Sequence, residues 1–217
     1  MNHATYEMIP QDVTIINKKS TAFDFWDVLE LSQFKNIRIC GYHQNYRLFG
    51  DANSRSISQE MNTTFKSLYG SPSWNPQTTG FIHIRRTKYM LPHIKMYNLT
   101  MDYYNDAIKY IESKKSVESW LVITDDIDWC KLQTWPENAR VYEETEEQKF
   151  FWALTQCQGA AIIANSTFSY WGAMAGAHLN LSPVVYPNAW HLQCPEPDLF
   201  PTTWIGLGSK EKSLKIY

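Results

Sequence analysis

Three polar clusters of this sequence carry side chains that suit a phosphorylated ligand. They are His83-Ile84-Arg85-Arg86, Asp125-Asp126, and Asn165-Ser166-Thr167 with Ser169, and each follows an apolar segment. Guanidinium groups offer planar forks of donors that clamp a diphosphate through paired hydrogen bonds. Ligands of open α/β sheets bind outside the carboxyl ends of the strands, so three clusters at three predicted strand ends predict one shared site.

The third cluster lies between a predicted strand at 160–164 and a predicted helix at 167–178. The first N–H groups of such a helix lack internal partners and stand at the positive end of the helix dipole, which favours a phosphate. The hydroxyls of Ser166 and Thr167 and the amide of Asn165 complete such a pocket. The alternative is that Ser166 and Thr167 form an ordinary N-cap.

Strand alternation decides which charged side chains share a face. Successive side chains point to opposite faces, so we expect one arginine to meet the ligand, and Arg85 shares a face with His83. Arg86 would then pair with an aspartate. One of Asp125 and Asp126 would accept hydrogen bonds from a ribose or a guanine, or else cap a helix. His83 is either a ligand contact or a buried core histidine.

The composition narrows the class of protein. The 217 residues are 44% hydrophobic with a net charge of −2, which supports a core and gives no broad basic surface for nucleic acid. Four widely spaced cysteines form no CxxC pair, and the nearest candidate for a metal site, 126–128, is expected to open a helix. No segment reaches the roughly 18 apolar residues of a membrane span, and no signal pattern opens the chain. We therefore expect a cytoplasmic protein or a domain of a larger one.

Apolar strands alternate with helices along most of the chain. The strands are predicted at 13–16, 36–40, 80–84, 120–124, 160–164 and 183–186, and the helices at 23–31, 55–68, 101–114, 145–158 and 167–178. Thr100 is the predicted N-cap of the third helix, and Thr145 opens a capping box for the fourth. This pattern predicts an α/β fold with a parallel sheet covered on both faces, and the breaker cluster at 70–76 predicts a domain boundary.

Several of these motifs resemble those of fucosyltransferases, above all the alpha-1,2-fucosyltransferase family. Residues 81–89 resemble its His-Ile-Arg-Arg-Gly-Asp-Tyr motif, and residues 124–131 resemble Ser-Asp-Asp-Ile-Glu-Trp-Cys-Lys. Residues 162–173 resemble Ile-Ile-Ala-Asn-Ser-Thr-Phe-Ser-Trp-Trp-Gly-Ala, and looser matches extend the resemblance over 36–206. Several motifs in the order of the family argue against chance.

The resemblance implies a GT-B fold with a Rossmann-type nucleotide-sugar-binding domain over 77–217 and a shortened acceptor-side α/β domain over 1–76. It implies an inverting transfer of L-fucose from GDP-fucose to a sugar hydroxyl of a glycan, without a metal or other cofactor. On the same resemblance His83 and Arg85 contact the donor diphosphate and ribose, and Asp125 or Asp126 holds the nucleoside. The phosphate pocket would be lined by Ser166, Thr167 and Ser169.

Two departures from the family keep a second hypothesis open. The Gly-Gly-Leu-Gly-Asn-Gln turn of the family has no match in 1–35, and Thr87-Lys88 replaces the usual Gly-Asp. The alternative is a catalytically weak nucleotide-sugar-binding module of a larger multidomain glycosyltransferase. A nucleotide-binding protein unrelated to sugars would rest on fold analogy alone.

Two residues are the candidates for catalysis. Arg85 would stabilise the departing diphosphate. In the related alpha-1,6-fucosyltransferases a Glu in the loop after the Arg-Arg strand is thought to be the base, and His93 stands at the matching distance here. An imidazole titrates near neutral pH and can take a proton from an acceptor hydroxyl. The alternatives are a solvated loop histidine, a base such as Asp51 or Glu60, or no base.

Overall fold

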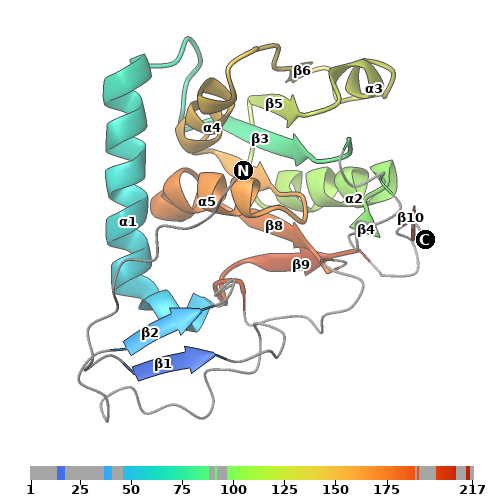
Figure 1. Cartoon of the computed structure of the whole chain (residues 1–217). Coiled ribbons are helices and arrows are strands. Elements are labelled where there is room, and N and C mark those ends of the chain that lie inside the picture. The colour runs from blue at the N-terminus through green and yellow to red at the C-terminus, as the bar shows by residue number, and fades with distance from the viewer. Residues whose placement is uncertain are drawn as a thin grey trace.

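A computed structural model gives the architecture of the chain (Figure 1). It describes residues 14–17, 37–40, 46–87, 91, 97–188, 190, 199–208 and 214–215. The helices are α1 (Tyr46–Tyr69), α2 (Met101–Glu112), α3 (Ile127–Lys131), α4 (Glu147–Gln156), α5 (Thr167–Ala175) and the 3-10 helix η2 (His178–Asn180). The strands are β1 (Thr14–Asn17), β2 (Ile37–Cys40), β3 (Thr79–Ile84), β4 (Tyr97–Asn98), β5 (Ser119–Thr124), β6 (Ala139–Val141), β7 (Ala160–Ile162), β8 (Val184–Pro187), β9 (Ile205–Leu207) and β10 (Leu214–Lys215).

Six parallel strands form the central sheet in the order β6-β5-β3-β7-β8-β9. If the six strands are numbered by their order in the sequence, this is the order 3-2-1-4-5-6 of Rossmann folds. In this order the strands are first added toward one edge of the sheet and then, from the fourth strand on, toward the other edge. The reversal therefore falls between β3 and β7. The predicted α/β fold with a parallel sheet is confirmed, and it is consistent with the Rossmann-like part of a GT-B fold. Two small sheets, β1-β2 and β4-β10, accompany it.

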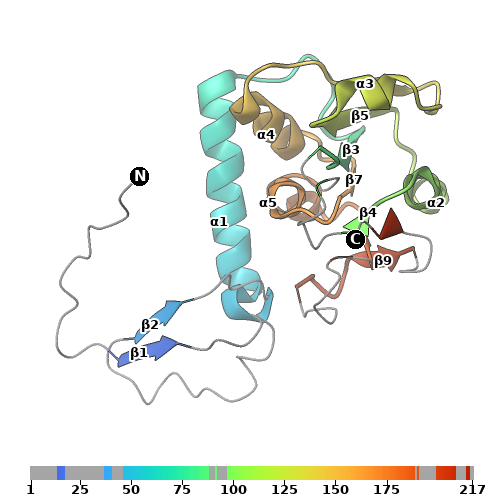
Figure 2. The same ribbon diagram turned by 45° about the vertical axis from the view of Figure 1, so that its right-hand side comes forward.

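Helices cover both faces of the sheet because the strands are apolar on both sides. Ile82 and Ile84 of β3 pack with α2 on one face, while Phe81 packs with α4 and α5 on the other. All three side chains are 0% exposed. A glycine brings α4 and α5 close together, because a Cβ added at Gly172 would lie 2.6 Å from the Cβ of Leu154. Figure 2 shows the sheet between these two helical layers.

The long helix α1 packs against α4 and α5 (Figures 1 and 2). The side-chain amide of Asn62 donates to the carbonyls of Thr155 at 2.8 Å and Ala175 at 2.9 Å, and so ties α1 to the ends of both helices. Gly70, with φ of +79°, follows the last residue of α1, as is common at helix C-termini. The breaker cluster at 70–76 thus separates α1 from β3, while the division at residue 76 into two domains stays a prediction.

Several predicted ends of helices differ from those in the structure. The helix predicted at 55–68 begins at Tyr46, and the helix predicted at 167–178 ends as α5 at Ala175. The capping box at Thr145 is wrong: the N-cap of α4 is Glu146, and the Glu144 carboxylate accepts from the Thr145 N–H at 2.8 Å. Thr100 is the N-cap of α2 as predicted, although its side chain makes no capping hydrogen bond.

Some predicted or observed elements cannot be matched with each other. The strands β6 and β9 at the sheet edges were not predicted, and the helix predicted at 23–31 lies outside the described residues. Within the described ranges no helix combines the length and the apolar character needed to cross a bilayer.

Candidate functional site

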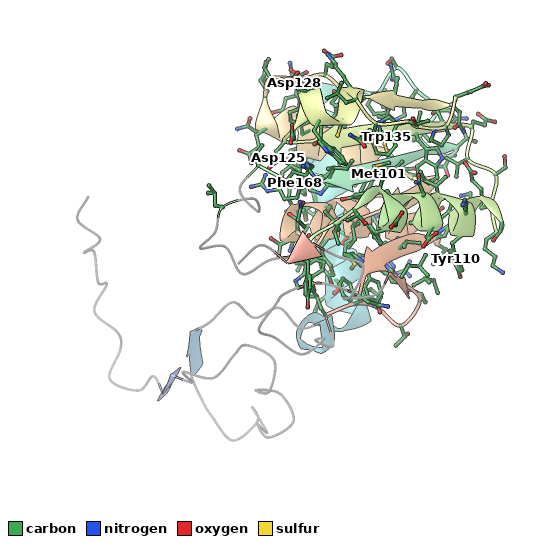
Figure 3. All side chains as sticks on the ribbon, turned by 90° about the vertical axis from the view of Figure 1, so that its right-hand side faces the viewer. Met101, Tyr110, Asp125, Asp128, Trp135 and Phe168 are labelled. Atoms are coloured by element: carbon green, nitrogen blue, oxygen red, sulfur yellow. The ribbon has the colours of Figure 1, made fainter. Side chains whose placement is uncertain are left out.

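The three polar clusters converge at the carboxyl edge of the sheet, on both sides of the reversal point. Pairing of Ile84 with Thr124 places the arginines after β3 beside the aspartates after β5. The β7–α5 turn lies on the other side of β3. Figure 3 shows Asp125 and Phe168 near each other at one end of the sheet, with Tyr110 toward the other end. The predicted convergence is therefore present in the structure.

Asp125 organises the turn in which the chain leaves β3. Its carboxylate accepts from the backbone N–H of Arg86 at 2.8 Å and from the hydroxyl of Thr87 at 2.6 Å. The same carboxylate lies 3.4 Å from Nη1 of Arg85, whose side chain is 27% exposed. Asp125 thus orients Arg85 at the edge of the sheet, where the Arg85 side chain stays partly exposed.

Arg86 is held between an acid and an aromatic ring. Its Nε lies 3.3 Å from Oδ2 of Asp126, and its guanidinium carbon lies 3.9 Å from the ring centroid of Trp129. Asp126 also caps α3 by accepting from the Trp129 N–H at 3.2 Å. These contacts are the ion pair and the helix cap that the sequence analysis kept as alternatives. Ligand contacts of Arg86 and Asp126 stay predictions.

His83 is a buried, neutral imidazole at this edge. It is 3% exposed, and its ring centroid lies 5.7 Å from that of Phe168. Burial lowers its pKa to about 3, although the nearby negative charge of Asp125 acts in the opposite direction. Its Nδ1 has no hydrogen-bond partner within the described part of the chain. A buried polar atom without a partner is costly, and a bound ligand would supply one.

The β7–α5 turn presents open hydrogen-bonding groups. Ser166 is the N-cap of α5, and its side chain makes no capping hydrogen bond. The Tyr170 N–H bonds to the Ser166 carbonyl at 3.0 Å as the first bond of the helix. The N–H groups of Thr167, Phe168 and Ser169 therefore have no helical partner. With the exposed Thr167, these groups make the end of α5 suitable for an anion.

Asn165 and Ser169 brace this turn from inside. Both are 0% exposed. The Asn165 amide donates to the carbonyls of Tyr97 at 2.9 Å and Trp190 at 3.0 Å. The Ser169 hydroxyl lies 3.1 Å from the Ser166 carbonyl and donates back into the turn. The contacts observed for these two residues position the helix end, and direct contact with a phosphate stays a prediction.

Several predicted positions lie beyond what the structure describes. Lys88 and the candidate base His93 lie outside the described residues, as does the side chain of Asp51. Glu60 is exposed on α1. Sequence reasoning also missed Trp129, which supports Arg86; its place three residues after the capping Asp126 is the local signal that could have indicated it.

The residues of the motif 126–128 are arranged as the start of a helix. Asp126 caps α3 and Asp128 is exposed in its first turn, as the sequence analysis expected. Among the described side chains, no three His, Cys, Asp or Glu residues are grouped so that they could hold a metal ion. Metal-independent donor binding stays a prediction.

A Rossmann-like sheet with a guanidinium and an open helix end at the reversal point has the arrangement of a nucleotide-binding α/β protein. The chain belongs to glycosyl transferase family 11, whose family profile matches residues 24–208. This confirms the resemblance to the alpha-1,2-fucosyltransferase family. The Rossmann-like sheet and the family match agree with each other.

Two curated proteins of Escherichia coli are similar to this chain. An O-antigen biosynthesis glycosyltransferase, WbnK, is 33% identical over 141 residues, which cover 61% of this chain and 45% of WbnK. An alpha-1,2-colitosyltransferase is 27% identical over 165 residues, which cover 71% of this chain and 56% of that enzyme. The chain thus spans about half the length of these relatives. No solved structure matches it.

Proposed function

We propose that this chain is a glycosyltransferase that binds a GDP-sugar, most favourably GDP-fucose, and transfers the sugar with inversion to a hydroxyl of a glycan. The observation that carries the proposal is the meeting of Arg85, His83 and the open end of α5 at the reversal point of the sheet. The name of one relative refers to colitosyl transfer. Colitose is therefore the second candidate for the donor sugar.

The diphosphate of the donor would lie between Arg85 and the first turn of α5. The guanidinium, oriented by Asp125 at 3.4 Å, would donate to the phosphate oxygens. The N–H groups of Thr167, Phe168 and Ser169 would donate from the other side. These fixed donors would stabilise the negative charge that develops on the leaving GDP without reorganising during the reaction.

His83 would contact the same donor as a neutral group. Its Nδ1 lacks a partner in the described residues, so a ligand atom placed there would satisfy it. Because burial keeps the pKa of His83 low, the imidazole adds no positive charge to the site before the donor binds. The cationic part of the clamp would come from Arg85.

The transfer itself would be a single displacement. The acceptor hydroxyl would attack the anomeric carbon on the face opposite the diphosphate, forming the new glycosidic bond. The bond between that carbon and the phosphate oxygen would break, and its electron pair would leave with GDP. His93 would take the hydroxyl proton, and positioning of the two substrates would supply much of the rate.

Isotope transfer tests the proposal. The full chain is incubated with radiolabelled GDP-fucose or GDP-linked colitose and a panel of glycans, with and without EDTA. We expect transfer of one of the two sugars, with the same rate in EDTA because no metal takes part in the proposal. Loss of transfer in EDTA would contradict metal independence.

The alternative is a catalytically weak binding module, and the departure that favours it is Thr87-Lys88 in place of the family's Gly-Asp. The same experiment separates the two functions when GDP binding is measured in parallel. Binding of GDP without transfer to any glycan would favour the module. Absence of GDP binding would contradict both.

A further inference from the structure

A pocket lies at the amino edge of the sheet, opposite the site described above. Its volume is about 540 Å³, within the range of small-molecule sites. Its walls come from the segment after α2, from η2, from α1 and from the residues that precede β8 and β9. Figure 3 shows that Tyr110, near the end of α2, lies away from Asp125 and Phe168. The pocket is therefore separate from the site at the carboxyl edge.

Among the described residues that line this pocket, the charged ones are Arg55, Lys114 and Lys115, and none is an Asp or a Glu. Among the described residues none of these three cations forms an ion pair. An anion bound in this pocket would be attracted by all three cations.

The contacts of Lys115 show that interaction with the dipole of α2 does not by itself account for these cations. Lysines after a helix are often explained by the helix dipole. Here the Lys115 ammonium donates to the hydroxyl of Ser182 at 2.8 Å, across the pocket and 67 residues along the chain. Burial lowers the pKa of Lys115, so its positive charge is partly desolvated and would gain from an anionic partner. Arg55 comes from the separate helix α1.

The remaining walls add hydrogen-bonding groups. His178 accepts from the indole N–H of Trp204 through Nδ1 at 3.1 Å, so a neutral His178 ring carries its proton on Nε2. Thr202 and Thr203 also line the pocket. The lining thus combines three cations with neutral polar groups, which suits the oxygens of a phosphate ester.

An exposed apolar residue stands at the same pocket. Leu181 is 80% exposed and is the one described non-glycine residue with a positive φ, at +54°. Leu181 adopts this left-handed conformation, which is strained for a bulky side chain, as the C-cap of η2. The strained backbone holds an apolar side chain beside a cationic pocket, where it can contact the apolar part of an amphiphile.

We propose that this amino-edge pocket, defined by Arg55, Lys114, Lys115, His178, Leu181 and Ser182, binds a diphosphate group. The diphosphate is carried either by a soluble ester or by a lipid whose apolar part contacts Leu181. The volume of about 540 Å³ exceeds what a diphosphate fills, which leaves room for the rest of such an ester. The proposal does not depend on the proposed transferase function, because no residue of the carboxyl-edge site lines the pocket.

Inorganic pyrophosphate is the first probe, and lysine acetylation mapped by mass spectrometry is the readout. We expect pyrophosphate to protect Lys114 and Lys115 of the full chain from acetylation, while the exposed Lys66 and Lys131 react as before. The readout is specific to residues, so pyrophosphate bound at Arg85 does not interfere. Equal protection of all four lysines, or protection of none, would overturn the proposal.

Calorimetry with matched variants is the second measurement. Arg55→Gln/Lys115→Gln removes two pocket cations, and Lys66→Gln/Lys131→Gln removes two exposed cations from α1 and the end of α3. We expect the pocket variant to lose at least about tenfold in pyrophosphate affinity at the pocket, and the control to lose little, because hydrogen bonds to charged groups dominate such binding. Both are compared in an Arg85→Ala background to remove the other site. Equal affinity in the two variants would overturn the proposal.

Vesicles distinguish the two sources of the diphosphate. Cosedimentation is measured with phosphatidylcholine vesicles that contain a polyprenyl diphosphate. Binding that falls in Arg55→Gln/Lys115→Gln and in Leu181→Ser, but not in the lysine control, supports the lipid form. Pyrophosphate protection without such vesicle binding supports a soluble ester. Vesicle binding that is equal in all variants, together with unprotected lysines, contradicts both forms.

Discussion

The two edges of the central sheet differ in whether their positively charged side chains are paired with carboxylates. At the carboxyl edge Arg85 lies 3.4 Å from Asp125 and Arg86 lies 3.3 Å from Asp126. At the amino edge Arg55, Lys114 and Lys115 line a pocket to which no described Asp or Glu contributes. Within the described part of the chain, the arginines of the carboxyl edge are therefore paired with carboxylates, whereas the cations of the amino-edge pocket are not.

This difference separates two contributions to anion binding: the orientation of the donor groups and the electrostatic attraction of the anion. An acid partner reduces the net charge that an arginine offers to an anion, but it fixes the direction of the donor fork. The end of α5 then supplies attraction through N–H groups that need no counter-ion. A site built in this way suits a reaction that demands geometry, while a pocket of unpaired cations suits simple anion binding. Each of the following changes tests one part of that contrast.

The largest expected effect is the loss of the proposed base, His93. His93→Ala should lower the turnover of sugar transfer by about 10²–10⁴-fold, because a positioned base contributes on that order. The affinity of the variant for GDP should stay unchanged, because a base that takes the proton of the acceptor hydroxyl has no part in GDP binding. Single-turnover transfer and a GDP isotherm measure the two effects. Wild-type turnover in this variant would place the base elsewhere.

The buried His83 predicts how the stability of the carboxyl edge depends on pH. Its pKa is about 3 in the folded chain and about 6.5 when unfolded, so below pH 6.5 the unfolded chain binds a proton that the folded chain does not. Stability should therefore fall as the pH drops from 6.5 toward 3, by up to about 1.4 kcal/mol per pH unit from this residue.

His83→Gln is the variant that isolates this effect. Denaturant unfolding of both proteins at pH 7, 6 and 5 gives two pH profiles, and the difference between them removes the shared titration of carboxylates. We expect the wild type to lose stability more steeply than His83→Gln below pH 6.5. Parallel profiles would show that His83 is accessible to protons in the folded state.

The close packing of α5 on α4 at Gly172 predicts a smaller effect, on the stability of the fold. A Cβ at Gly172 would lie 2.6 Å from the Cβ of Leu154, so Gly172→Ala must push α4 and α5 apart. Overpacking of this kind typically costs about 1–3 kcal/mol. Urea unfolding measures the loss. An unchanged midpoint would show that the two helices can separate without cost, and then the position of α5 would not depend on this packing.

The smallest expected effect concerns the cap of α3. Asp126→Ala removes the hydrogen bond to the Trp129 N–H and the ion pair with Arg86, and should cost about 0.5–2 kcal/mol of stability. Asp128→Ala is the control, because Asp128 is exposed in the first turn of the same helix. Equal melting temperatures of the two variants would mean that the cap contributes nothing measurable.

The strand–helix alternation and the polar clusters at strand ends could be predicted because both are local. An apolar run such as 160–164 followed by Asn165-Ser166-Thr167 contains its own strand, turn and helix start. The edge strands β6 and β9 could not, because each has three residues that are exposed or half-buried and shows no clear period. The first turns of α1 were missed because the apolar repeat begins only at Ile57.

The sequence predicted the interactions between individual side chains only as alternatives. Strand alternation favoured Arg85 as the ligand contact and an ion pair for Arg86, and the structure shows both arginines beside an acid. The amino-edge pocket left no signal in the sequence, because Arg55 and Lys115 are 60 residues apart and meet Ser182 only after folding. The missing partner of His83 likewise follows from its three-dimensional surroundings rather than from its neighbours in sequence.

The most direct test of donor binding at the carboxyl edge is a GDP isotherm of the full chain with Arg85 replaced. Arg85→Ala should weaken GDP binding about 10–100-fold, in line with about 1.5–3 kcal/mol for hydrogen bonds to a charged group, and Arg85→Lys should restore little because an ammonium lacks the fork. Arg140→Ala, an exposed arginine on the edge strand β6, should bind GDP like the wild type. An Arg85→Ala protein that is folded and binds GDP with unchanged affinity would contradict the account.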